Sequence, residues 1–302
     1  MFSRFPVSLA FALCVAAPLS AETVNIETAV GPAEVPANPE TIAVFDMAAL
    51  DAIDALGITV AGVPQPHYLS YLDDAAATAQ SVGSLFEPDF EALAMIAPDL
   101  IVAGGRSSTQ VDALSRIAPT IDMTIWDGDY LDVAQARVRA YGEIFGKQDD
   151  AEALASALVA KTEEAENAVE GRGDALILLT NGGKISAYGS ASRFGWLHTA
   201  LGLPEAYPGL ESETHGEAVS FEFVAEVDPD WILVIDRGAA IGNSGESAAA
   251  TLDNPLIAKT RAAKQGQIVY LDSGPLYIAG GGVQSMTHTL DEVIAAFSRD
   301  GN

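Results

Sequence analysis

Two stretches of this chain carry nearly the same sequence, and this duplication constrains the fold more than any other feature. The first runs from Phe90 to Arg106 and the second from Phe221 to Arg237. Each copy predicts a short helix, a Pro-Asp turn and a buried strand whose carboxyl end delivers an arginine. Ligands of open α/β sheets sit beyond the carboxyl ends of the strands. The duplication therefore predicts two equivalent lobes that aim Arg106 and Arg237 at one place.

The rest of the chain alternates between apolar runs of strand length and helical patterns. Near-continuous hydrophobicity, typical of strands buried on both faces of a parallel sheet, predicts strands at 41–46, 99–103, 120–126, 175–181, 231–236 and 267–272. Helices are predicted at 47–56, 90–96, 108–117, 130–145 and 284–297. Residues 24–29 and the Pro/Gly-rich 30–39 predict a small edge hairpin. The expected fold class is α/β, with two Rossmann-like lobes that each hold a central, mostly parallel sheet.

One long helix is expected to join the two lobes. Asp149 or Asp150 can cap it, alanine and leucine fill it, and Gly171 can end it. Twenty residues make about 30 Å of helix, enough to cross between two domains, and this joint permits only modest opening. The predicted division is a signal peptide at 1–21, an N-terminal lobe at 22–147, the inter-lobe helix at 148–171 and a C-terminal lobe at 172–302.

The first residues predict export. Arg4 precedes an apolar run at 5–17, and Ala21 supplies the small residue that a signal peptidase needs. A lipid anchor needs a small residue before the cysteine, whereas Cys14 follows Leu13. We therefore expect cleavage after Ala21, a periplasmic protein that is not lipid-anchored, and a mature chain without disulfides or thiolate metal sites.

Charge and motifs narrow the function classes. The chain holds 42 aspartates and glutamates against 15 lysines and arginines, a formal charge of −27. Such acidity argues against binding to nucleic acid or anionic lipid. The sequence has no P-loop, no G-x-S-x-G, no H-E-x-x-H, and no G-x-G-x-x-G after a strand. The protein is not predicted to be an enzyme, although a secreted hydrolase on two lobes stays as an alternative.

Four more residues lie at predicted strand ends or in the loops beyond them. They are Trp126, Arg193, His215 and Tyr277. Each has an ordinary structural explanation when taken alone, such as a packed tryptophan or a surface arginine. Together with the two repeat arginines, they describe a cleft at one sheet edge for an anionic, aromatic or metal-bearing ligand.

The duplicated segment, the signal peptide and the single inter-lobe helix together resemble the class III periplasmic binding proteins. These serve ABC importers of ferric siderophores, haem and cobalamin. The segments ending in Gly104-Gly105-Arg106 and Ile235-Asp236-Arg237, and the segment Ser192-Arg193-Phe194, are similar to those of the catecholate-siderophore branch, which includes enterobactin- and petrobactin-type receptors. Haem or corrinoid binding remains the alternative within the same class.

That resemblance implies roles for particular residues. Arg106, Arg193 and Arg237 would form a basic floor beneath a ferric catecholate. Trp126 is also expected to contact the ligand, because of its place at a predicted strand end and not because of the resemblance. His215 and Tyr277 would ligate the iron if a tetradentate siderophore leaves two positions open. No intrinsic cofactor is implied, because Fe(III) arrives as the siderophore complex.

The resemblance also implies a partner. A monomeric receptor would present one glutamate on each lobe to an inner-membrane ABC permease dimer. Glu91 and Glu222 match these glutamates by motif and by symmetry. The alternative for both is structural, because a carboxylate in the first turn of a helix is favoured by the helix dipole.

Overall fold

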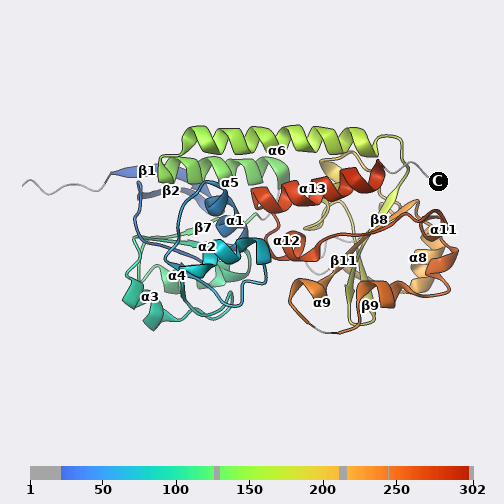
Figure 1. Ribbon diagram of the computed structural model, residues 1–302, viewed down its shortest axis with the longest axis horizontal. Helices are drawn as coiled ribbons and strands as arrows, with labels where there is room; N and C mark the ends of the chain where they lie inside the picture. Colours follow the sequence, from blue (N-terminus) through green and yellow to red (C-terminus); the bar gives the residue numbers. More distant parts are fainter. Residues whose placement is uncertain (1–21, 126–129, 211–215, 244, 299–302) are drawn as a thin grey trace, which may run out of the picture.

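Two five-stranded sheets lie beneath a shared layer of long helices (Figure 1). The computed structural model describes residues 22–125, 130–210, 216–243 and 245–298. We call the described part of residues 22–147 the N-terminal lobe and that of residues 172–298 the C-terminal lobe. Helix α6, Gln148–Val169, runs along one side of the molecule past both sheets. At 22 residues it is about 33 Å long.

The two sheets share a plan but differ at one edge. The N-terminal sheet has the order β5-β4-β3-β6-β7 and is parallel throughout. The C-terminal sheet has the order β10-β9-β8-β11-β12, in which β9 runs antiparallel to both of its neighbours. The strands are β1 Thr23–Thr28, β2 Gly31–Pro36, β3 Ile42–Val44, β4 Gly62–Val63, β5 Gln80–Ser81, β6 Leu100–Ala103, β7 Thr120–Asp122, β8 Ala175–Asn181, β9 Lys184–Tyr188, β10 Glu217–Val219, β11 Trp231–Asp236 and β12 Ile268–Tyr270. The predicted edge hairpin is present as antiparallel β1 and β2.

Short helices connect the strands, and three long ones form the common layer. The α-helices are α1 Met47–Ala55, α2 Asp73–Ala77, α3 Phe90–Ile96, α4 Val111–Leu114, α5 Tyr130–Phe145, α6, α7 Trp196–Thr199, α8 Phe221–Val227, α9 Arg237–Ala240, α10 Ala248–Leu252, α11 Arg261–Gln265, α12 Ser273–Ile278 and α13 Val283–Phe297. The 3-10 turns are η1 Ser70–Leu72, η2 Gly105–Gln110 and η3 Ile257–Lys259. Helix α13 packs against α6, α5 and α1, so it covers both lobes. Within the described residues, none of the helices is long and apolar enough to cross a membrane.

Alternating side chains of the central strands feed separate cores on the two faces of each sheet. In β11, Leu233 and Ile235 enter the core beneath the long helices, whereas Ile232 and Val234 enter a core on the opposite face. This is the period of two that a strand imposes on its side chains. Burial on both faces explains why the central strands read as continuous apolar runs. The core beneath the long helices contains residues of both lobes, so the lobes share one apolar interior.

The duplicated unit folds as predicted in both lobes. Helices α3 and α8 each have seven residues, and each ends on a residue in the left-handed conformation, Ala97 with φ 50° and Asp228 with φ 47°. Pro98 and Pro229 follow, and each leads into a strand of the sheet. The left-handed cap stops the helix and reverses the chain toward the strand.

Several predicted boundaries are wrong, and aspartates at strand ends explain most of them. The strands predicted at 41–46, 120–126 and 267–272 end early, at Val44, Asp122 and Tyr270. In the first case, Asp46 caps α1 by accepting from the Ala48 amide at 2.8 Å. In the second, the Asp122 carboxylate accepts from the Thr124 amide at 2.9 Å and turns the chain. The helix predicted at 108–117 is instead η2 followed by α4.

A buried carboxylate of the N-terminal lobe caps the last helix of the chain. Asp51, on α1, is fully buried and accepts from the backbone amides of Gln284 and Ser285 at 2.8 and 2.9 Å. It also accepts from the Tyr71 hydroxyl at 2.7 Å. Burial raises the pKa of Asp51 to about 7, despite these three hydrogen bonds. The start of α13 is therefore fixed by a residue from the other lobe.

Candidate functional site

Arg106 leaves the N-terminal sheet at the carboxyl end of β6. Gly104 follows the strand where no side chain fits, because a Cβ there would clash with the Asp46 carboxylate. Gly105 then turns with φ +53°, and its amide donates to Thr124 Oγ1 at 2.8 Å. The two glycines thus let the chain turn sharply and place Arg106 in the first turn of η2.

Arg237 leaves the C-terminal sheet at the equivalent point with different chemistry. Asp236 ends β11, and its carboxylate accepts from the Ala239 amide at 3.0 Å and the Ala248 amide at 2.7 Å. Arg237 is the first residue of α9. The predicted strand-end arginine is thus present in both copies.

Tyr277 lies on a helix, whereas the sequence predicted a loop. Asp272 caps α12 by accepting from the Gly274 amide at 3.3 Å. Pro275 then falls in the first turn, where its missing N–H has no intrahelical partner to lose. The Ser-Gly-Pro start therefore nucleates a short helix, which fixes Tyr277 more firmly than a loop would.

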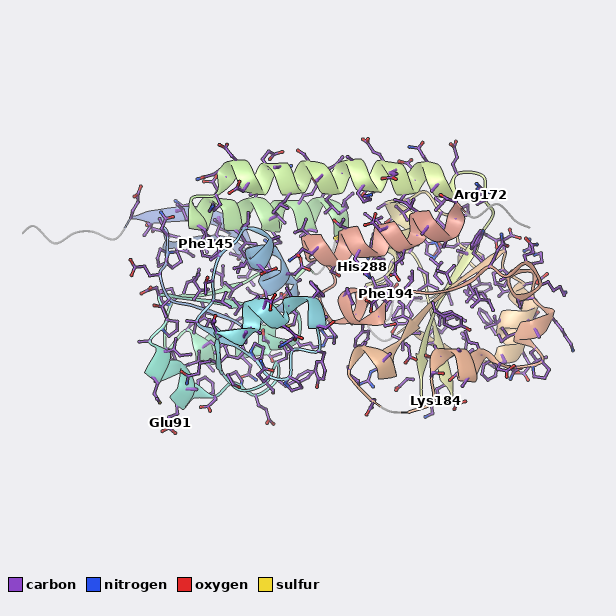
Figure 2. All side chains as sticks on the ribbon, in the orientation of Figure 1. Glu91, Phe145, Arg172, Lys184, Phe194 and His288 are labelled. Carbon is purple, nitrogen blue, oxygen red and sulfur yellow. The ribbon has the colours of Figure 1, made fainter. Side chains whose placement is uncertain are left out.

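Arg193 reaches the site from an unexpected direction. It was predicted at the same sheet edge as the other arginines. However, β9 is antiparallel, and its last residue, Tyr188, pairs with Ile177 near the start of β8. The segment carrying Arg193 therefore leaves the opposite end of the sheet. It returns over the face that packs under the long helices, where Phe194 contacts Tyr188 edge-on at 4.8 Å between ring centroids. Figure 2 shows Phe194 near α12, between the two lobes.

The three arginines converge on Tyr277. Its carbonyl accepts from Arg193 at 2.7 Å and from Arg106 at 3.0 Å. The guanidinium carbons of Arg193 and Arg106 lie 4.8 and 5.1 Å from the centroid of its ring. Arg237 Nε donates to its hydroxyl at 3.2 Å. Residues of both lobes are thus held around one tyrosine by charge-assisted hydrogen bonds and cation–π contacts.

This positive charge is only partly offset, because Arg106 acts electrostatically on the Asp46 carboxylate without forming an ion pair with it. Among the described residues, none of the three arginines takes part in an ion pair, although the chain as a whole carries 42 acidic residues. Burial and the repulsion of Arg106 lower the pKa of Arg193 from its usual range. A guanidinium nonetheless stays protonated in proteins, so the site is cationic. An anion of complementary shape would relieve this repulsion.

The arginines also change the acidity of Tyr277. Burial by itself raises its pKa, but the Arg237 hydrogen bond and the charges of Arg106 and Arg193 outweigh burial and lower the pKa below the ordinary value. The neighbouring Tyr130 behaves in the opposite way, because burial raises its pKa to about 12. Tyr277 is therefore the phenol whose anionic form the site favours.

Aromatic rings adjoin the cluster, and a cavity that none of the three arginines lines lies along the helix that carries Tyr277. Tyr130 stacks on Trp196 with 6.4 Å between ring centroids, and Arg193 lies over Phe194 at 4.8 Å. This cavity of about 390 Å³ lies along the start of α12, between residues 68–71 of the N-terminal lobe and residues that include Ala239 and 273–275 of the C-terminal lobe. Tyr130 was not predicted as a site residue, although its position a few residues beyond the predicted strand 120–126 was the available signal.

Two predicted site residues, Trp126 and His215, lie outside the described residues. Within the described part, no group of three or more histidine, cysteine, aspartate or glutamate side chains is arranged to hold a metal ion.

Glu91 and Glu222 are both exposed. Figure 2 shows Glu91 at the end of the N-terminal lobe that lies away from α6. Neighbouring residues cap the two helices: Asp89 accepts from the Glu91 amide at 3.0 Å, and Ser220 from the Phe223 amide at 3.2 Å. Neither glutamate side chain is thus needed as a helix cap.

Comparison with known proteins identifies relatives over most of the chain. Residues 42–275 match the family model described as "Periplasmic binding protein". The petrobactin-binding protein YclQ of Bacillus subtilis (strain 168) is 39% identical over 272 residues, which cover 86% of this chain and 83% of that protein. The ferric-anguibactin-binding protein FatB of Vibrio anguillarum is 29% identical over 280 residues, which cover 90% and 87%.

Solved structures of similar proteins have the same fold. The crystal structure of YclQ superposes with a TM-score of 0.85 at 34% identity and covers 92% of this chain and 100% of that one. The catecholate-siderophore-binding protein VctP of Vibrio cholerae gives 0.84 at 33% identity and covers 91% and 100%.

Proposed function

Because the chain belongs to the periplasmic binding protein family, we propose that it captures a ferric siderophore of the catecholate type outside the cytoplasmic membrane and delivers it to an ABC permease. The observation that carries this proposal is the convergence of Arg106, Arg193 and Arg237 on Tyr277 without carboxylate partners in the described chain. The names of the relatives support it, because they are binding proteins for petrobactin, ferric anguibactin and a catecholate siderophore.

The chemistry of the ligand fits the site. A ferric tris-catecholate is a planar-ringed anion, and a guanidinium can both donate to its oxygens and stack on its rings. Arg106 and Arg193 already make both kinds of contact with Tyr277, through its carbonyl and its ring. In a chain of net charge −27, this local positive field is what attracts an anionic ligand.

A titration with four ligand classes tests the proposal. Tryptophan fluorescence would report on Trp196, which is stacked beside the arginine cluster. We expect quenching by ferric catecholates and weaker or no response to ferric hydroxamates, haem and cobalamin. A response to haem or cobalamin alone would overturn the proposal in favour of the other ligand classes.

Single arginine substitutions test the floor itself. Arg106→Ala, Arg193→Ala and Arg237→Ala should each weaken binding by roughly 1.5–3 kcal/mol, since each removes a charge-assisted contact. Their effects should not add, because the three side chains share one ligand. Arg116→Ala is the matched control, since it removes one exposed cation that has no ion pair among the described residues. Parent-like binding by all three variants would place the ligand elsewhere.

We further propose that Tyr277 ligates Fe(III) when the siderophore leaves coordination positions open. Its lowered pKa supports this role, because a bound metal takes the phenolate. With a tetradentate ferric complex, Tyr277→Phe should abolish a ligand-to-metal charge-transfer band, whereas a hexadentate complex should show little change. His215→Ala in the same assay tests the second predicted ligand. A charge-transfer band unchanged by both substitutions would contradict direct ligation.

Docking to a dimeric permease is proposed to use Glu91 and Glu222. Both are exposed, both belong to equivalent helices, and neither serves as a cap. Glu91→Ala or Glu222→Ala should reduce siderophore uptake by cells while the affinity of the purified protein for its ligand stays unchanged. Full uptake by the double variant would exclude this pair.

The form in which the protein is released is also a proposal. The Leu13-Cys14 order and the small residue at Ala21 favour cleavage after Ala21 over a lipid anchor. Mass spectrometry of the exported protein should find Glu22 at the amino terminus and no lipid. Light scattering of the same sample should give the mass of a monomer.

A further inference from the structure

The cavity at the start of α12 differs in its chemistry from the arginine cluster. Its walls come from residues 68–71 of the N-terminal lobe, residues 272–275 of the C-terminal lobe and the start of α13. None of the three arginines that converge on Tyr277 lines it. Its volume of about 390 Å³ is enough for a small organic molecule. We call it the α12 cavity.

The side chains of the α12 cavity leave hydrogen-bond acceptors available. Tyr71 donates its hydroxyl proton to Asp51 at 2.7 Å, so the phenol oxygen can only accept from a ligand. The amide nitrogen of Gln284 donates to the Asp51 carbonyl at 2.8 Å and to Asp54 at 2.9 Å. Its amide oxygen has no partner among the described residues. Asp272 adds an exposed carboxylate.

Ser285 adds a polar group for which the fold supplies no partner. It lies in the wall of the cavity and is 1% exposed, and its hydroxyl makes no hydrogen bond within the described chain. The nearby Ser273 differs, because its hydroxyl donates to the Leu271 carbonyl at 3.0 Å and accepts from the Asp236 amide at 2.7 Å. Buried hydroxyl groups in native proteins are nearly always paired, so the Ser285 hydroxyl calls for a partner from outside the chain.

The surroundings of the α12 cavity are negatively charged. Asp51 is buried behind Tyr71 and takes part in no ion pair among the described residues. Burial and the charge of Asp51 raise the pKa of Tyr71, and Asp54 and Asp272 act in the same direction. Of the described residues that line the cavity, only His288 can carry a positive charge, and its Nε2 lies 3.3 Å from Asp272 Oδ2. Such a field favours a cation.

We propose that the α12 cavity binds a small organic cation with a primary ammonium group, at a place distinct from the arginine cluster. The three N–H groups of an ammonium match the acceptors that Tyr71, Gln284 and Ser285 offer, and Asp272 supplies a counter-charge. The rings of Tyr68 and Tyr71, 42% and 37% exposed, can add cation–π contacts.

The same chemistry disfavours other occupants. A quaternary ammonium has no N–H group, so it would leave the acceptors unpaired, and a neutral alcohol lacks the charge. A metal ion is a poor fit, because the described residues contain no group of three side chains arranged to ligate one. The inference does not depend on the proposed siderophore.

A titration with three probes of similar chain length tests the proposal without siderophore. Butylammonium, butyltrimethylammonium and butan-1-ol are added at constant ionic strength and pH 8, where an alkylamine is still protonated. Amide shifts in NMR spectra give both the affinity and the place of binding. We expect saturable binding of butylammonium with shifts at Gln284 and Ser285, and at least about tenfold weaker binding of the other two probes.

Equal binding of butylammonium and butyltrimethylammonium would show only the general attraction of a cation to a chain of net charge −27, and would overturn the proposal. The absence of saturable shifts up to 100 mM butylammonium would overturn it as well. Neither result depends on whether a ferric siderophore binds, so failure here is distinguishable from failure of the proposed function.

Two substitutions test the named acceptors. Ser285→Ala removes a hydroxyl that makes no hydrogen bond in the described chain, so it should weaken butylammonium binding about fivefold without lowering the melting temperature. Asp272→Asn removes the counter-charge while asparagine can still cap α12, and it should weaken binding by at least as much. Asp149→Asn is the matched control, because it removes an exposed carboxylate from the first turn of α6. Parent-like affinity in both test variants would place the cation elsewhere and refute the proposal.

Discussion

Both lobes contain the Pro-Asp turn, but different hydrogen bonds fix the turn in the two copies. In the N-terminal lobe, Asp99 accepts from the amides of Glu40 and Thr41 at 3.0 and 2.8 Å and so ties the start of β6 to the start of β3. In the C-terminal lobe, Asp230 accepts from the Asp174 amide at 3.2 Å, and its own amide donates to Asp174 at 2.9 Å. This ties the start of β11 to the start of β8. The repeated aspartate thus sets the register of the two central strands in each sheet.

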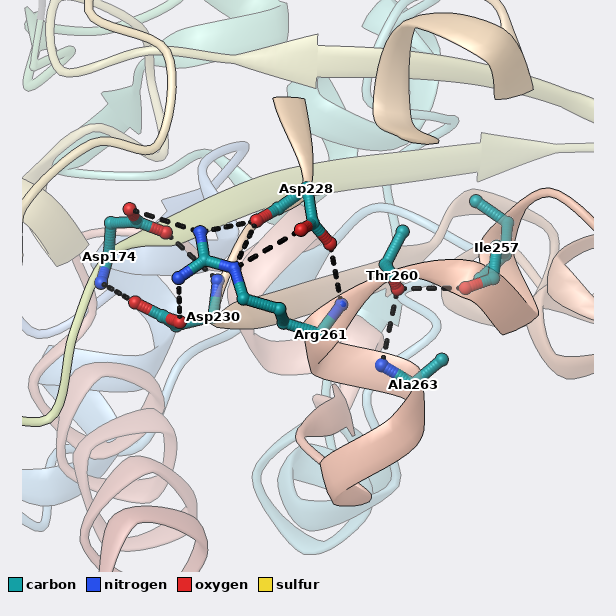
Figure 3. A network of polar contacts seen from close by, with 7 residues as sticks. All are labelled: Asp174, Asp228, Asp230, Ile257, Thr260, Arg261 and Ala263. Atoms are coloured by element: carbon teal, nitrogen blue, oxygen red, sulfur yellow. Dashed lines mark hydrogen bonds and ion pairs between the residues drawn. The ribbon is translucent and has the colours of Figure 1, made fainter. Parts of the chain in front are cut away.

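The C-terminal copy adds a cation that the N-terminal copy does without. Arg261 pairs with Asp230 and lies near Asp174 and Asp228, as Figure 3 shows. Its backbone amide also donates to Asp228 at 2.6 Å, which joins α11 to the end of α8. Three carboxylates in one place repel each other unless a cation lies between them. A duplicated motif can thus keep its role in the backbone while its surroundings determine the electrostatics.

The largest expected effect comes from breaking the contact that makes the lobes interdependent. Asp51→Ala should lower the free energy of unfolding by about 3 kcal/mol at pH 5, because two backbone donors and the Tyr71 hydroxyl lose their buried acceptor. Urea unfolding measures this value. A loss below 0.5 kcal/mol, taken as roughly the noise of such a measurement, would show that α13 does not depend on the other lobe.

The difference in unfolding free energy between the parent protein and Asp51→Ala should also depend on pH, in a direction that follows from the pKa of Asp51. Burial raises the pKa of Asp51 from 3.8 to about 7, with nearby Asp54 adding to the effect, so the folded protein holds a proton that the unfolded chain has released between these values. The unfolding free energy of the parent should therefore fall as the pH rises from about 4 to about 7. Asp51→Ala lacks this contribution, so the difference between parent and variant should narrow by roughly 2 kcal/mol between pH 5 and pH 8.

Removing the positive charge of Arg261 should lower the stability of the protein less than removing the Asp51 carboxylate does. Arg261→Gln should destabilise the protein by about 1–2 kcal/mol, because three carboxylates lose their shared partner, while the 42% exposure of the arginine side chain limits the effect. The loss should shrink at high salt in thermal unfolding experiments. Arg116→Gln is the control for a change of net charge. Equal effects of the two substitutions would show that the network contributes nothing specific.

The hydrogen bonds of Asp99 in the N-terminal copy should contribute less to stability than the Arg261 network does. Asp99→Ala should cost about 1 kcal/mol, because the amides of Glu40 and Thr41 are near solvent and exchange the carboxylate for water. If Asp99→Ala proves more destabilising than Arg261→Gln in the same assay, the Pro-Asp turn of the N-terminal copy contributes more to stability than that of the C-terminal copy, contrary to this prediction.

The smallest expected effect comes from placing glycine at the left-handed cap of each copy. The change in stability should have opposite signs in the two copies. Ala97→Gly should stabilise the protein by about 0.5 kcal/mol, because alanine at φ 50° carries a strain that glycine lacks. Asp228→Gly should destabilise, since it also removes the carboxylate that accepts from the Arg261 amide. Shifts of the same sign in thermal melts would refute the view that only the C-terminal cap is tied to a network.

Sequence reasoning succeeded where one physical pattern dominates. The strands at 175–181 and 231–236 and the helices at 90–96 and 130–145 have the predicted bounds, because long apolar runs and clear caps leave no competing structure. The two-residue strands β4 and β5 were missed, since they are too short to carry a period. Strand β9 and its antiparallel direction were not predicted either, and with them the route of Arg193 was missed. Direction within a sheet is decided by tertiary packing and not by local composition.

Part of the candidate site could also be predicted from the sequence, where one pattern dominates. Arg106 and Arg237 were predicted from the duplication, because equivalent strands end at equivalent places. The helix that carries Tyr277 was not predicted, since the Asp272 cap and the first-turn proline were read as a loop. That all three arginines meet at one tyrosine depends on the packing of η2, α9 and α12 between the lobes, which no single segment encodes.

The cap that Asp51 gives to α13 also bears on the order in which the chain becomes a folded protein. The carboxylate is supplied by residue 51, but its amide partners belong to residues 284 and 285, which are synthesised 233 and 234 residues later. Until they arrive, Asp51 lacks these partners, and the apolar interior shared by the lobes lacks the face of α13. The described lobes therefore complete their shared interior only after α13 has been made, so a fragment that stops short of α13 should remain open to proteases.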